Sequence, residues 1–339
     1  MSLPTPTQVQ GWVALAARAP SAHNVQPARW RLRGERLELW EEPARWLAAG
    51  DPSGRDASIG LGMAWEGLHL AAGADGWTLG EPQYDVATYP PGASPRRRAS
   101  ARLEAGGAAD PLAAFVAARH CCRQVFPAAS ADQRQRIEDV FATHADIALP
   151  APADALGGFA AAHQRASIEL LRDRAVGAEL YSWLRLSPRH PDAARDGLDA
   201  ACLGLGPLEA LGGRVMMRPT IAALLARIGL GGLLVDEAAK TRSAAAIAVL
   251  AVPPGVDDFE AGRRWYRFWL ALAGARFAAV PMSALVDTAA GREALASLQP
   301  LPAGWRGINV MRIGPAPAAL PASARLPAGE LLVVDATGA

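Results

Sequence analysis

A short stretch near the start of the chain, residues 20–27, concentrates side chains that could bind a ligand. It reads Pro-Ser-Ala-His-Asn-Val-Gln-Pro, so Ser21, His23, Asn24 and Gln26 bring hydrogen-bonding groups together between two prolines that restrict the backbone. A compact polar loop of this kind, held between regular elements, suits a flat ligand with a polar edge. The same residue types also form ordinary turns, so the loop alone supports either interpretation.

A second candidate lies at Arg119-His120-Cys121-Cys122-Arg123-Gln124-Val125-Phe126. If this run is helical, Arg119 and Arg123 lie four residues apart on one face, where their repulsion is relieved when an anion binds between them. Arginine suits phosphate because its planar fork donates paired hydrogen bonds to phosphate oxygens. The run therefore predicts a phosphate site, and an exposed basic helix end is the alternative.

Two further segments follow near the C-terminus. Residues 261–283 carry Trp265, Phe268, Trp269 and Leu272 at helical spacing, which predicts a long helix with one apolar face of core residues. A turn, Pro281-Met282-Ser283, ends that segment. Residues 308–314 then read as a strand, before a proline-rich stretch that contains Arg325.

Taken in order, these pieces resemble the FMN-dependent nitroreductase superfamily. The 20–27 loop is similar to the family's flavin-ring loop, and the 119–126 run is similar to its phosphate-binding motif, with His120 and Cys121 in place of the usual arginine and serine. The resemblance implies these cofactor-binding residues: Ser21, Ala22, His23, Asn24 and Gln26 around the ring or ribityl chain; Arg119, Arg123 and Arg325 at the phosphate, with His120 and Cys121 in the same run; and Pro281, Met282 and Ser283 beside the flavin.

The order of the pieces resembles the double-length members of that superfamily, because the loop precedes the arginine motif. The implied fold is α+β and nitroreductase-like, with mostly antiparallel sheets covered by helices and two related halves in one chain, a pseudo-dimer. We expect an N-terminal half at 1–110 and a C-terminal half at 111–339, with a lid at 178–240. Residues 51–77 resemble a helix of that superfamily. Its buried apolar face is expected to consist of Leu61, Trp65, Leu68 and Ala72.

The implied function is an FMN-dependent oxidoreductase that takes electrons from NADPH or NADH and passes them to a small unsaturated acceptor, such as a nitroaromatic, a quinone or a biosynthetic intermediate. An FMN storage protein with little turnover is one alternative, and a specialised flavin-dependent dehydrogenase or oxygen-using enzyme is another. No catalytic side chain is identified. His23 could donate a proton near the ring, although a histidine that only orders the loop is favoured.

The amino-acid composition argues against other classes of partner and site. Lys+Arg 34 and Asp+Glu 33 nearly cancel, so no global charge favours nucleic acid or an anionic membrane as a partner. Three cysteines, scattered histidines and no metal-binding spacing predict no metal site and a cytoplasmic setting. We expect either a monomeric pseudo-dimer or a homodimer.

Local patterns also predict individual elements. Residues 30–32 and 36–40 flank Gly34-Glu35 as a hairpin, and Ser130 with Gln133 forms a capping box. Helices are expected at 155–173, 176–186 and 219–228, and a buried strand at 244–252.

Overall fold

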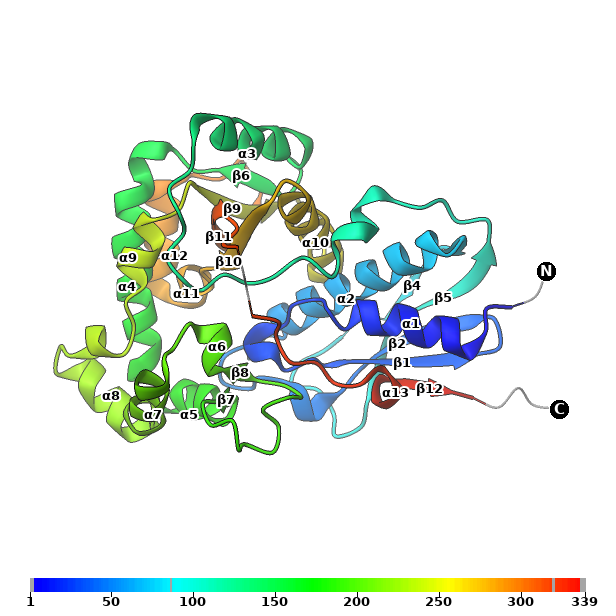
Figure 1. Ribbon diagram of the computed structural model, residues 1–339, viewed down its shortest axis with the longest axis horizontal. Coiled ribbons are helices and arrows are strands. Elements are labelled where there is room, and N and C mark those ends of the chain that lie inside the picture. Colours follow the sequence, from blue (N-terminus) through cyan, green and yellow to red (C-terminus); the bar gives the residue numbers. More distant parts are fainter. Residues whose placement is uncertain (1–2, 86, 319–320, 336–339) are drawn as a thin grey trace.

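The computed structural model describes residues 3–85, 87–318 and 321–335 and contains two main sheets (Figure 1). The first sheet is built from β1 (Ala28–Arg33), β2 (Arg36–Glu41), β3 (Trp77–Leu79), β4 (Gln83–Tyr84), β5 (Arg96–Ala105) and β12 (Leu332–Val334). The second is built from β6 (Ala148–Pro150), β9 (Ala246–Val252), β10 (Phe277–Pro281) and β11 (Arg306–Pro315).

Within these two sheets every strand pair is antiparallel except β1 with β12. Helices pack on the sheets, and the described residues include no helix that is both long and apolar enough to cross a membrane. The predicted α+β class, with mostly antiparallel sheets and helical cover, is confirmed.

The two sheets have the same strand order. The first runs β1-β2-β5-β3 and the second runs β6-β9-β11-β10, with the same antiparallel directions. A helix precedes each set, α1 (Pro6–Ala16) before β1 and α3 (Ala131–Thr143) before β6. A long helix also follows the second strand of each, α2 (Arg55–Ala74) after β2 and α10 (Asp258–Gly274) after β9. The two sets of elements differ because β1 and β2 form a tight hairpin, whereas a long helical insertion separates β6 from β9.

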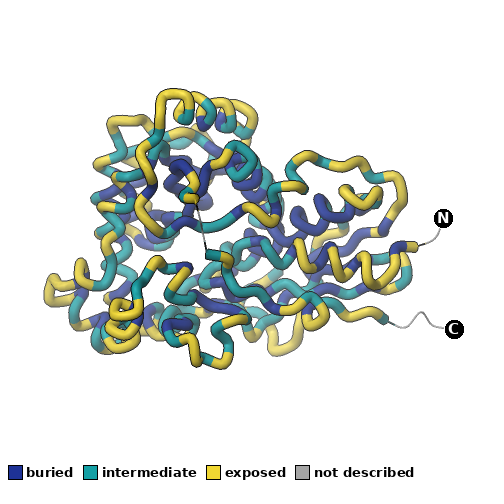
Figure 2. Tube along the Cα trace, in the orientation of Figure 1, coloured by how far each residue is buried: buried dark blue, intermediate teal, exposed yellow. Residues whose placement is uncertain are grey.

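The centre of the molecule is the packed pair α2 and α10, which Figure 2 shows as dark, buried tube. Nearly all of α2 from Ser58 to Ala72 is buried, because its sequence is mostly apolar or small. The buried carboxylate of Glu66 is the exception in charge, and it accepts hydrogen bonds from Arg263 and Arg267 of α10. The helix has no side-chain cap at Gly54. Instead the carboxylate of Asp51 accepts a hydrogen bond from the backbone N–H of Ala57 at 2.8 Å, near the helix start.

The insertion lies at the left and lower left of Figure 1, and its colour runs from green at α4 to yellow-green at α9. Its elements are α4 (Leu156–Arg172), α5 (Arg174–Ser182), β7 (Leu184–Arg185), β8 (Leu198–Asp199), α6 (Ala200–Leu203), α7 (Pro207–Met216), α8 (Pro219–Arg227) and α9 (Glu237–Arg242). Two short helices, α11 (Ala284–Asp287) and α12 (Ala289–Leu298), follow β10, and α13 (Ala328–Leu331) precedes β12. The helices predicted at 155–173 and 219–228 are confirmed.

Other local predictions are also confirmed. The β1–β2 hairpin, β9 and β11 lie where expected, and Ser130 Oγ accepts from Gln133 N at 3.1 Å while Gln133 Oε1 accepts from Ser130 N at 2.9 Å. The helix predicted at 176–186 ends at Ser182 instead, because Leu184 and Arg185 pair with β8.

One predicted helical segment is wrong, and another predicted helix is confirmed but ends earlier than expected. The segment 119–126 is extended, because Cys121 bridges to Ala279 of β10 and Arg312 of β11 donates hydrogen bonds to the carbonyls of Cys122 and Gln124. The predicted helix at 261–283 ends at Gly274, and residues 277–281 form β10.

The C-terminal segment also departs from the expected division into halves. Strand β12 pairs in parallel with β1, so the end of the described chain lies on the first sheet, although the expected second half was 111–339. The segment that carries Arg325 therefore crosses from the second sheet to the first, and passes the 20–26 loop on the way.

Candidate functional site

A cavity of about 300 Å³ lies among α2, α10, β10 and the insertion. Its walls come from the 20–23 loop, α2, α10, β10 and helices α4 and α5. Among the residues predicted from the sequence, it is lined by Ser21, Ala22, His23, Cys121, Arg123, Pro281 and Ser283. Most of the remaining wall is apolar, and the volume is at the lower end of the range for small-molecule sites.

A smaller cavity of about 30 Å³ adjoins the first one. The two share five lining residues, Pro20, Ser21, Cys121, Arg123 and Leu198, so they form a wide chamber with a narrow end. The narrow end is lined by Arg18, Arg119, Arg123 and Arg325 and by no acidic residue.

The arginines of the narrow end have no acidic partner in the described part of the chain. Arg119 is 3% exposed, and its Nε and Nη1 have no hydrogen-bond partner among the described residues. Its Nη2 donates to the carbonyl of Arg18 at 2.7 Å, and its guanidinium lies 4.6 Å from the ring centroid of Trp269. Arg325 Nε is also buried and unpartnered. Buried donors without acceptors are costly, so this arrangement favours a bound anion.

The electrostatics agree with that conclusion. Burial, together with Arg119 and Arg18, lowers the pKa of Arg325 to about 10. Burial and Arg119 also lower the pKa of Arg18. The ring of His120 donates from Nδ1 to the carbonyl of Ala118 at 2.8 Å, which leaves Nε2 to accept from Arg18 at 3.4 Å. Burial lowers the pKa of His120, so this neutral form is favoured.

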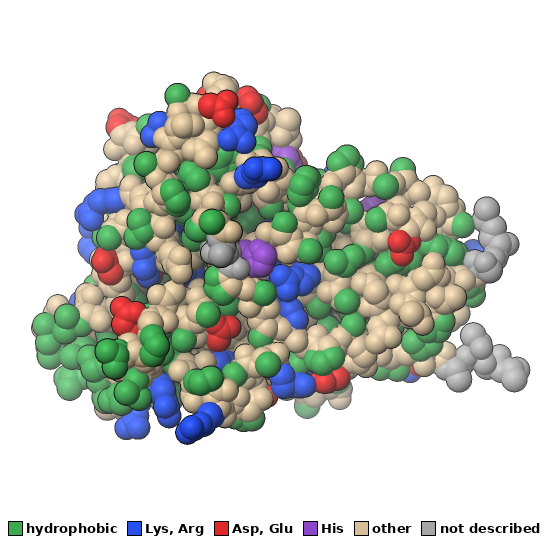
Figure 3. Space-filling model, in the orientation of Figure 1, with side chains coloured by type: hydrophobic (Ala, Val, Ile, Leu, Met, Phe, Trp, Pro, Cys, Tyr) green, Lys and Arg blue, Asp and Glu red, His purple; other side chains and the backbone are tan. Residues whose placement is uncertain are grey.

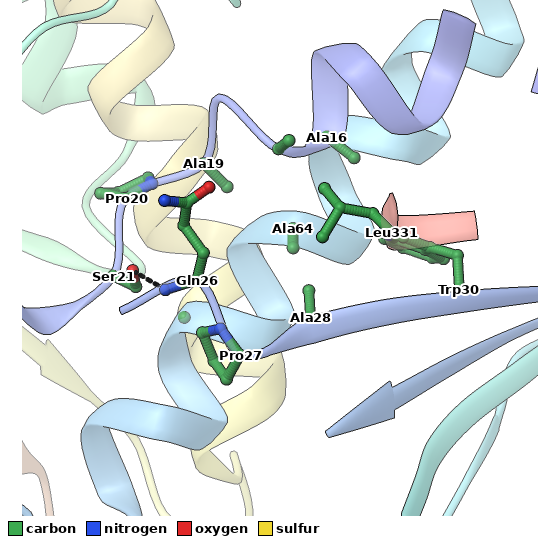
Figure 4. A pocket seen from close by; sticks show the side chains of 12 residues that line it. Ala16, Ala19, Pro20, Ser21, Gln26, Pro27, Ala28, Trp30, Ala64 and Leu331 are labelled. Atoms are coloured by element: carbon green, nitrogen blue, oxygen red, sulfur yellow. Dashed lines mark hydrogen bonds between the residues drawn. The ribbon is translucent and has the colours of Figure 1, made fainter. Parts of the chain in front are cut away.

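The 20–26 loop has an unusual backbone. His23, Asn24 and Gln26 have φ values of 49°, 58° and 52°, in the left-handed region that non-glycine residues seldom occupy. Figure 4 shows Ser21 Oγ accepting a hydrogen bond from Gln26 N at 2.9 Å, which closes the loop. The crevice beneath it holds only about 20 Å³, so the ligand space lies on the other side of the loop.

The side-chain amides of Asn24 and Gln26 form hydrogen bonds with other segments of the chain. Asn24 Nδ2 donates to the carbonyls of Gly197 and Ala324, and its Oδ1 accepts from Arg325 at 2.8 Å. Gln26 Nε2 donates to the carbonyl of Arg195, and its Oε1 accepts from Leu326 N. These amides hold the insertion and the C-terminal segment against the loop, and Gln26 does not line the chamber.

His23 lines the chamber, but its protonation does not suit a donor. Burial and the nearby Arg123 lower the pKa of His23 from 6.5 to about 4. At neutral pH the ring is therefore neutral, and the structure favours a loop-ordering role over proton donation from an imidazolium. Met282 is fully buried in a core cluster and does not line the chamber, unlike its neighbours Pro281 and Ser283.

Several residues that line the chamber were not predicted from the sequence. Arg18 lies between the loop and the helix that ends at Ala16. Its place directly before the loop is the sequence feature that could have identified it. Trp265 and Trp269 were assigned to the core, and they are buried yet also line the chamber. Asp56 and Asp287 line the chamber too, and both accept from Arg55 Nη2, at 2.8 and 2.6 Å.

The insertion closes one side of the chamber. Leu180 and Leu198 of the expected lid, 178–240, line it together with Leu170 and Val176. The segment between β7 and β8 is fixed by Asp196, which accepts from Arg185 Nη2 at 2.7 Å and from Arg45 Nη1 at 3.1 Å. Because both partners of the Arg185–Asp196 pair are about 6% exposed at the side chain, this is a buried ionic contact.

The fold and site together describe an α+β protein with a largely apolar chamber and a narrow cationic end. No family model matches the chain. It is 39% identical over 74 residues to "Putative NAD(P)H nitroreductase Rv3131" of Mycobacterium tuberculosis, which is 22% of each chain. It is 40% identical over 70 residues to "Putative NAD(P)H nitroreductase acg" of the same organism, 21% of each chain.

The chain thus matches about a fifth of the length of these curated relatives, and over that stretch they confirm the predicted resemblance to nitroreductases. A solved nitroreductase-like family protein from Bacillus cereus is similar with a TM-score of 0.35 and 14% identity, covering 67% of this chain and 96% of that one.

Proposed function

We propose that this protein is an FMN-dependent oxidoreductase of the nitroreductase superfamily. It takes electrons from NADPH or NADH and passes them to a small unsaturated acceptor. The observation that carries the proposal is the set of buried, unpartnered guanidinium atoms of Arg119 and Arg325 at one end of a flat-ligand chamber. FMN has a ring at one end and a phosphate at the other, and the wide chamber with a cationic end fits both.

The residues would divide the work by position. Arg18, Arg119, Arg123 and Arg325 would hold the phosphate, because each can supply guanidinium donors where no carboxylate competes. Ser21, Ala22, His23, Pro281 and Ser283 line the wide chamber and would surround the ring. Asn24 acts indirectly, since its Oδ1 orients Arg325. The flavin, when bound, supplies the hydride chemistry, and the protein supplies orientation and limits access of water.

Arg312 has a positioning role in this arrangement. It is 1% exposed and donates Nη1 to the carbonyl of Gln124 and Nη2 to the carbonyl of Cys122. The backbone that carries Arg123 is thereby fixed against β11. A helix would have used those carbonyls internally, so the extended conformation depends on this clamp.

We also propose that the chain is a pseudo-dimer of two related halves. The equal strand order of the two sheets, and the long helix after the second strand of each, support this proposal. The chamber lies between the halves, since its walls include α2 and α10. One chain would then supply a site that otherwise needs two subunits.

FMN storage with little turnover is the second candidate function, because residues of the insertion cover the chamber and the buried Arg185–Asp196 pair fixes the cover. A covered flavin would exchange slowly and react poorly. The two functions share the same phosphate site and differ only in access to the ring.

The test is flavin binding followed by reduction. The purified protein, incubated with FMN and desalted, should retain flavin absorption, and riboflavin, which lacks the phosphate, should bind roughly tenfold or more weakly. The double variant Arg123→Ala/Arg325→Ala should lose this preference, whereas Arg134→Ala on the exposed face of α3 should keep it. Bleaching by NADPH or NADH without oxygen supports the oxidoreductase, and persistent bands support storage. A protein that binds neither flavin contradicts both.

A further inference from the structure

One stretch of the insertion holds more than half of the large apolar side chains that are exposed in the described part of the chain. We call it the 208–233 patch, after its first and last members. Its most exposed residues are Leu208 at 84%, Leu211 at 58%, Leu224 at 57%, Ile228 at 59% and Leu233 at 70%. Figure 3 shows the patch as a green cluster over α7 and α8, at the corner farthest from the chain termini. Monomeric proteins seldom expose so much contiguous apolar surface without a partner.

In helix α8 the fully buried side chains are small, and part of the larger apolar surface is exposed. Its buried positions are alanines, Ala222, Ala223 and Ala226, while the larger Leu224 faces solvent and Ile228 follows it at the surface. Burying the larger side chains would have removed more apolar area from water. Ile221 and Leu225 are only half-buried, and Leu224 and Ile228 stay exposed, which favours a surface that is covered when a partner binds.

The charge of the patch is positive. Arg214, Arg218 and Arg227 are exposed on the same two helices and the turn between them. Between residues 207 and 234 the sequence has one acidic residue, Glu209, whose carboxylate accepts a hydrogen bond from Gly206 N at 2.7 Å and caps α7. This local excess of positive charge is not apparent from the net charge of the whole chain, which is +1. An anionic partner is therefore favoured.

The charge and the shape of the 208–233 patch distinguish among three kinds of partner: a second copy of the chain, a peptide helix and a lipid bilayer. A second copy related by a two-fold axis would place these arginines against one another, so like charges would oppose association. A peptide helix needs a groove, but the patch covers a projecting corner (Figure 3). An anionic bilayer fits both properties, because leucines on a projecting surface enter the acyl boundary while arginines meet the headgroup phosphates.

We propose that the 208–233 patch docks this protein peripherally on an anionic lipid bilayer. The sequence-based expectation of no membrane partner came from the net charge, which does not report local charge. Docking here leaves α1, β1 and both described ends of the chain on the opposite side of the molecule, away from the bilayer (Figure 1).

Co-sedimentation of the full chain with vesicles tests the proposal. Vesicles of phosphatidylcholine and phosphatidylglycerol should bind the protein, and added salt should weaken the binding. Pure phosphatidylcholine vesicles should bind it at least several-fold less. The variants Leu211→Glu/Leu233→Glu and Arg214→Ser/Arg218→Ser/Arg227→Ser should each reduce binding by roughly tenfold or more. These positions are exposed, so circular dichroism should show unchanged folding.

Matched controls separate the patch from general stickiness. Leu3→Glu, at another exposed apolar position, and Arg134→Ser, at another exposed arginine, should bind vesicles like the wild type. Binding that is lost only in the patch variants supports the proposal. Absence of vesicle binding overturns it, as does equal loss in the controls. Concentration-dependent dimers that Leu211→Glu/Leu233→Glu abolishes, without vesicle binding, also overturn it and identify a second copy as the occupant.

Discussion

Gly62 of α2 and Gly262 of α10 lie at the crossing of the two central helices in a reciprocal arrangement. A Cβ on Gly62 would be 1.9 Å from the carbonyl oxygen of Phe259, and a Cβ on Gly262 would be 2.1 Å from that of Ile59. Each glycine thus faces the residue three positions before the other. Reciprocal contacts of this kind are expected of a two-fold interface, and here they occur within one chain.

The first prediction concerns that crossing. Gly62→Ala and Gly262→Ala should each lower the free energy of unfolding by about 1–3 kcal/mol or more, because the added methyl meets backbone that cannot yield without separating the helices. Urea unfolding measures this change. Gly157→Ala in α4 is the control, since a Cβ there has no neighbour within 4 Å and alanine favours a helix. Equal effects at the three positions would contradict the close crossing.

The second prediction concerns the cationic end of the chamber. Inorganic phosphate should raise the melting temperature of the flavin-free protein more than chloride at equal ionic strength, because it neutralises Arg18, Arg119 and Arg325. At a concentration of about 100 times Kd, binding adds about 2.7 kcal/mol to stability. Differential scanning fluorimetry measures the shift.

Arg119→Leu should remove most of that shift, because the unpartnered Nε and Nη1 atoms are lost. Arg134→Leu, at an exposed position, should leave it unchanged. If phosphate and chloride act alike on the wild type, the narrow end is not an anion site.

Much of the fold followed from local sequence patterns. The β1–β2 hairpin, the Ser130–Gln133 capping box and the buried strands β9 and β11 depend on neighbouring residues, so periodicity and turn chemistry were enough to predict them. The conformation of residues 119–126 could not be predicted from local patterns, because it depends on hydrogen bonds from Arg312, which is far along the chain. Helical spacing of two arginines carries no information about such a contact.

The candidate site, like the fold, was predictable in part. The loop and arginine motifs were found from their residue types, and the structure brings Ser21, Arg119, Arg123 and Arg325 to one pair of adjoining cavities. The roles of Asn24 and Gln26 were not predictable, because their amides bond to segments roughly 170 and 300 residues away. A polar residue in a loop shows that it can bond, but not to which partner.

The third prediction concerns pH. Burial lowers the pKa of His163 from 6.5 to about 4, and its Nδ1 lies 3.0 Å from Thr241 Oγ1. The unfolded chain takes up a proton below pH 6.5 while the folded chain does not, so this stabilisation is full above pH 6.5 and is lost as pH falls toward 4. His163→Asn should therefore make the free energy of unfolding less dependent on pH, by up to about 2 kcal/mol between pH 6.5 and 5. Urea unfolding at both pH values measures it.

A matched variant should show the opposite sign. Burial and the nearby Asp56 raise the pKa of Asp51 to about 7, so the folded chain holds a proton that the unfolded chain has released above about pH 4. Asp51 therefore stabilises the fold less as pH rises toward 7. Asp51→Asn, which keeps an acceptor for Ala57 N, should gain stability relative to the wild type over that range. Equal pH dependence in both variants would contradict these two assignments.

The last prediction concerns the cover of the chamber. Asp196 is buried and accepts from both Arg185 and Arg45, so Asp196→Ala leaves Arg185 buried without its counter-charge. Breaking such a pair costs about 3–5 kcal/mol locally, which should open the segment between β7 and β8. We expect faster FMN release, measured by recovery of flavin fluorescence, and new protease cleavage between residues 185 and 198.

Arg195→Gln is the control, because the Arg195–Glu330 pair is exposed, and exposed pairs contribute little. The same experiment separates the two candidate functions. If the cover limits access to the flavin, Asp196→Ala should oxidise NADPH faster than the wild type. That result is expected if the wild type is a storage protein that shields the flavin ring. If the wild type already turns over and the variant only loses FMN, the cover holds the cofactor in a working enzyme. Identical FMN release from Asp196→Ala and Arg195→Gln would show that the Asp196 contacts do not hold the cover.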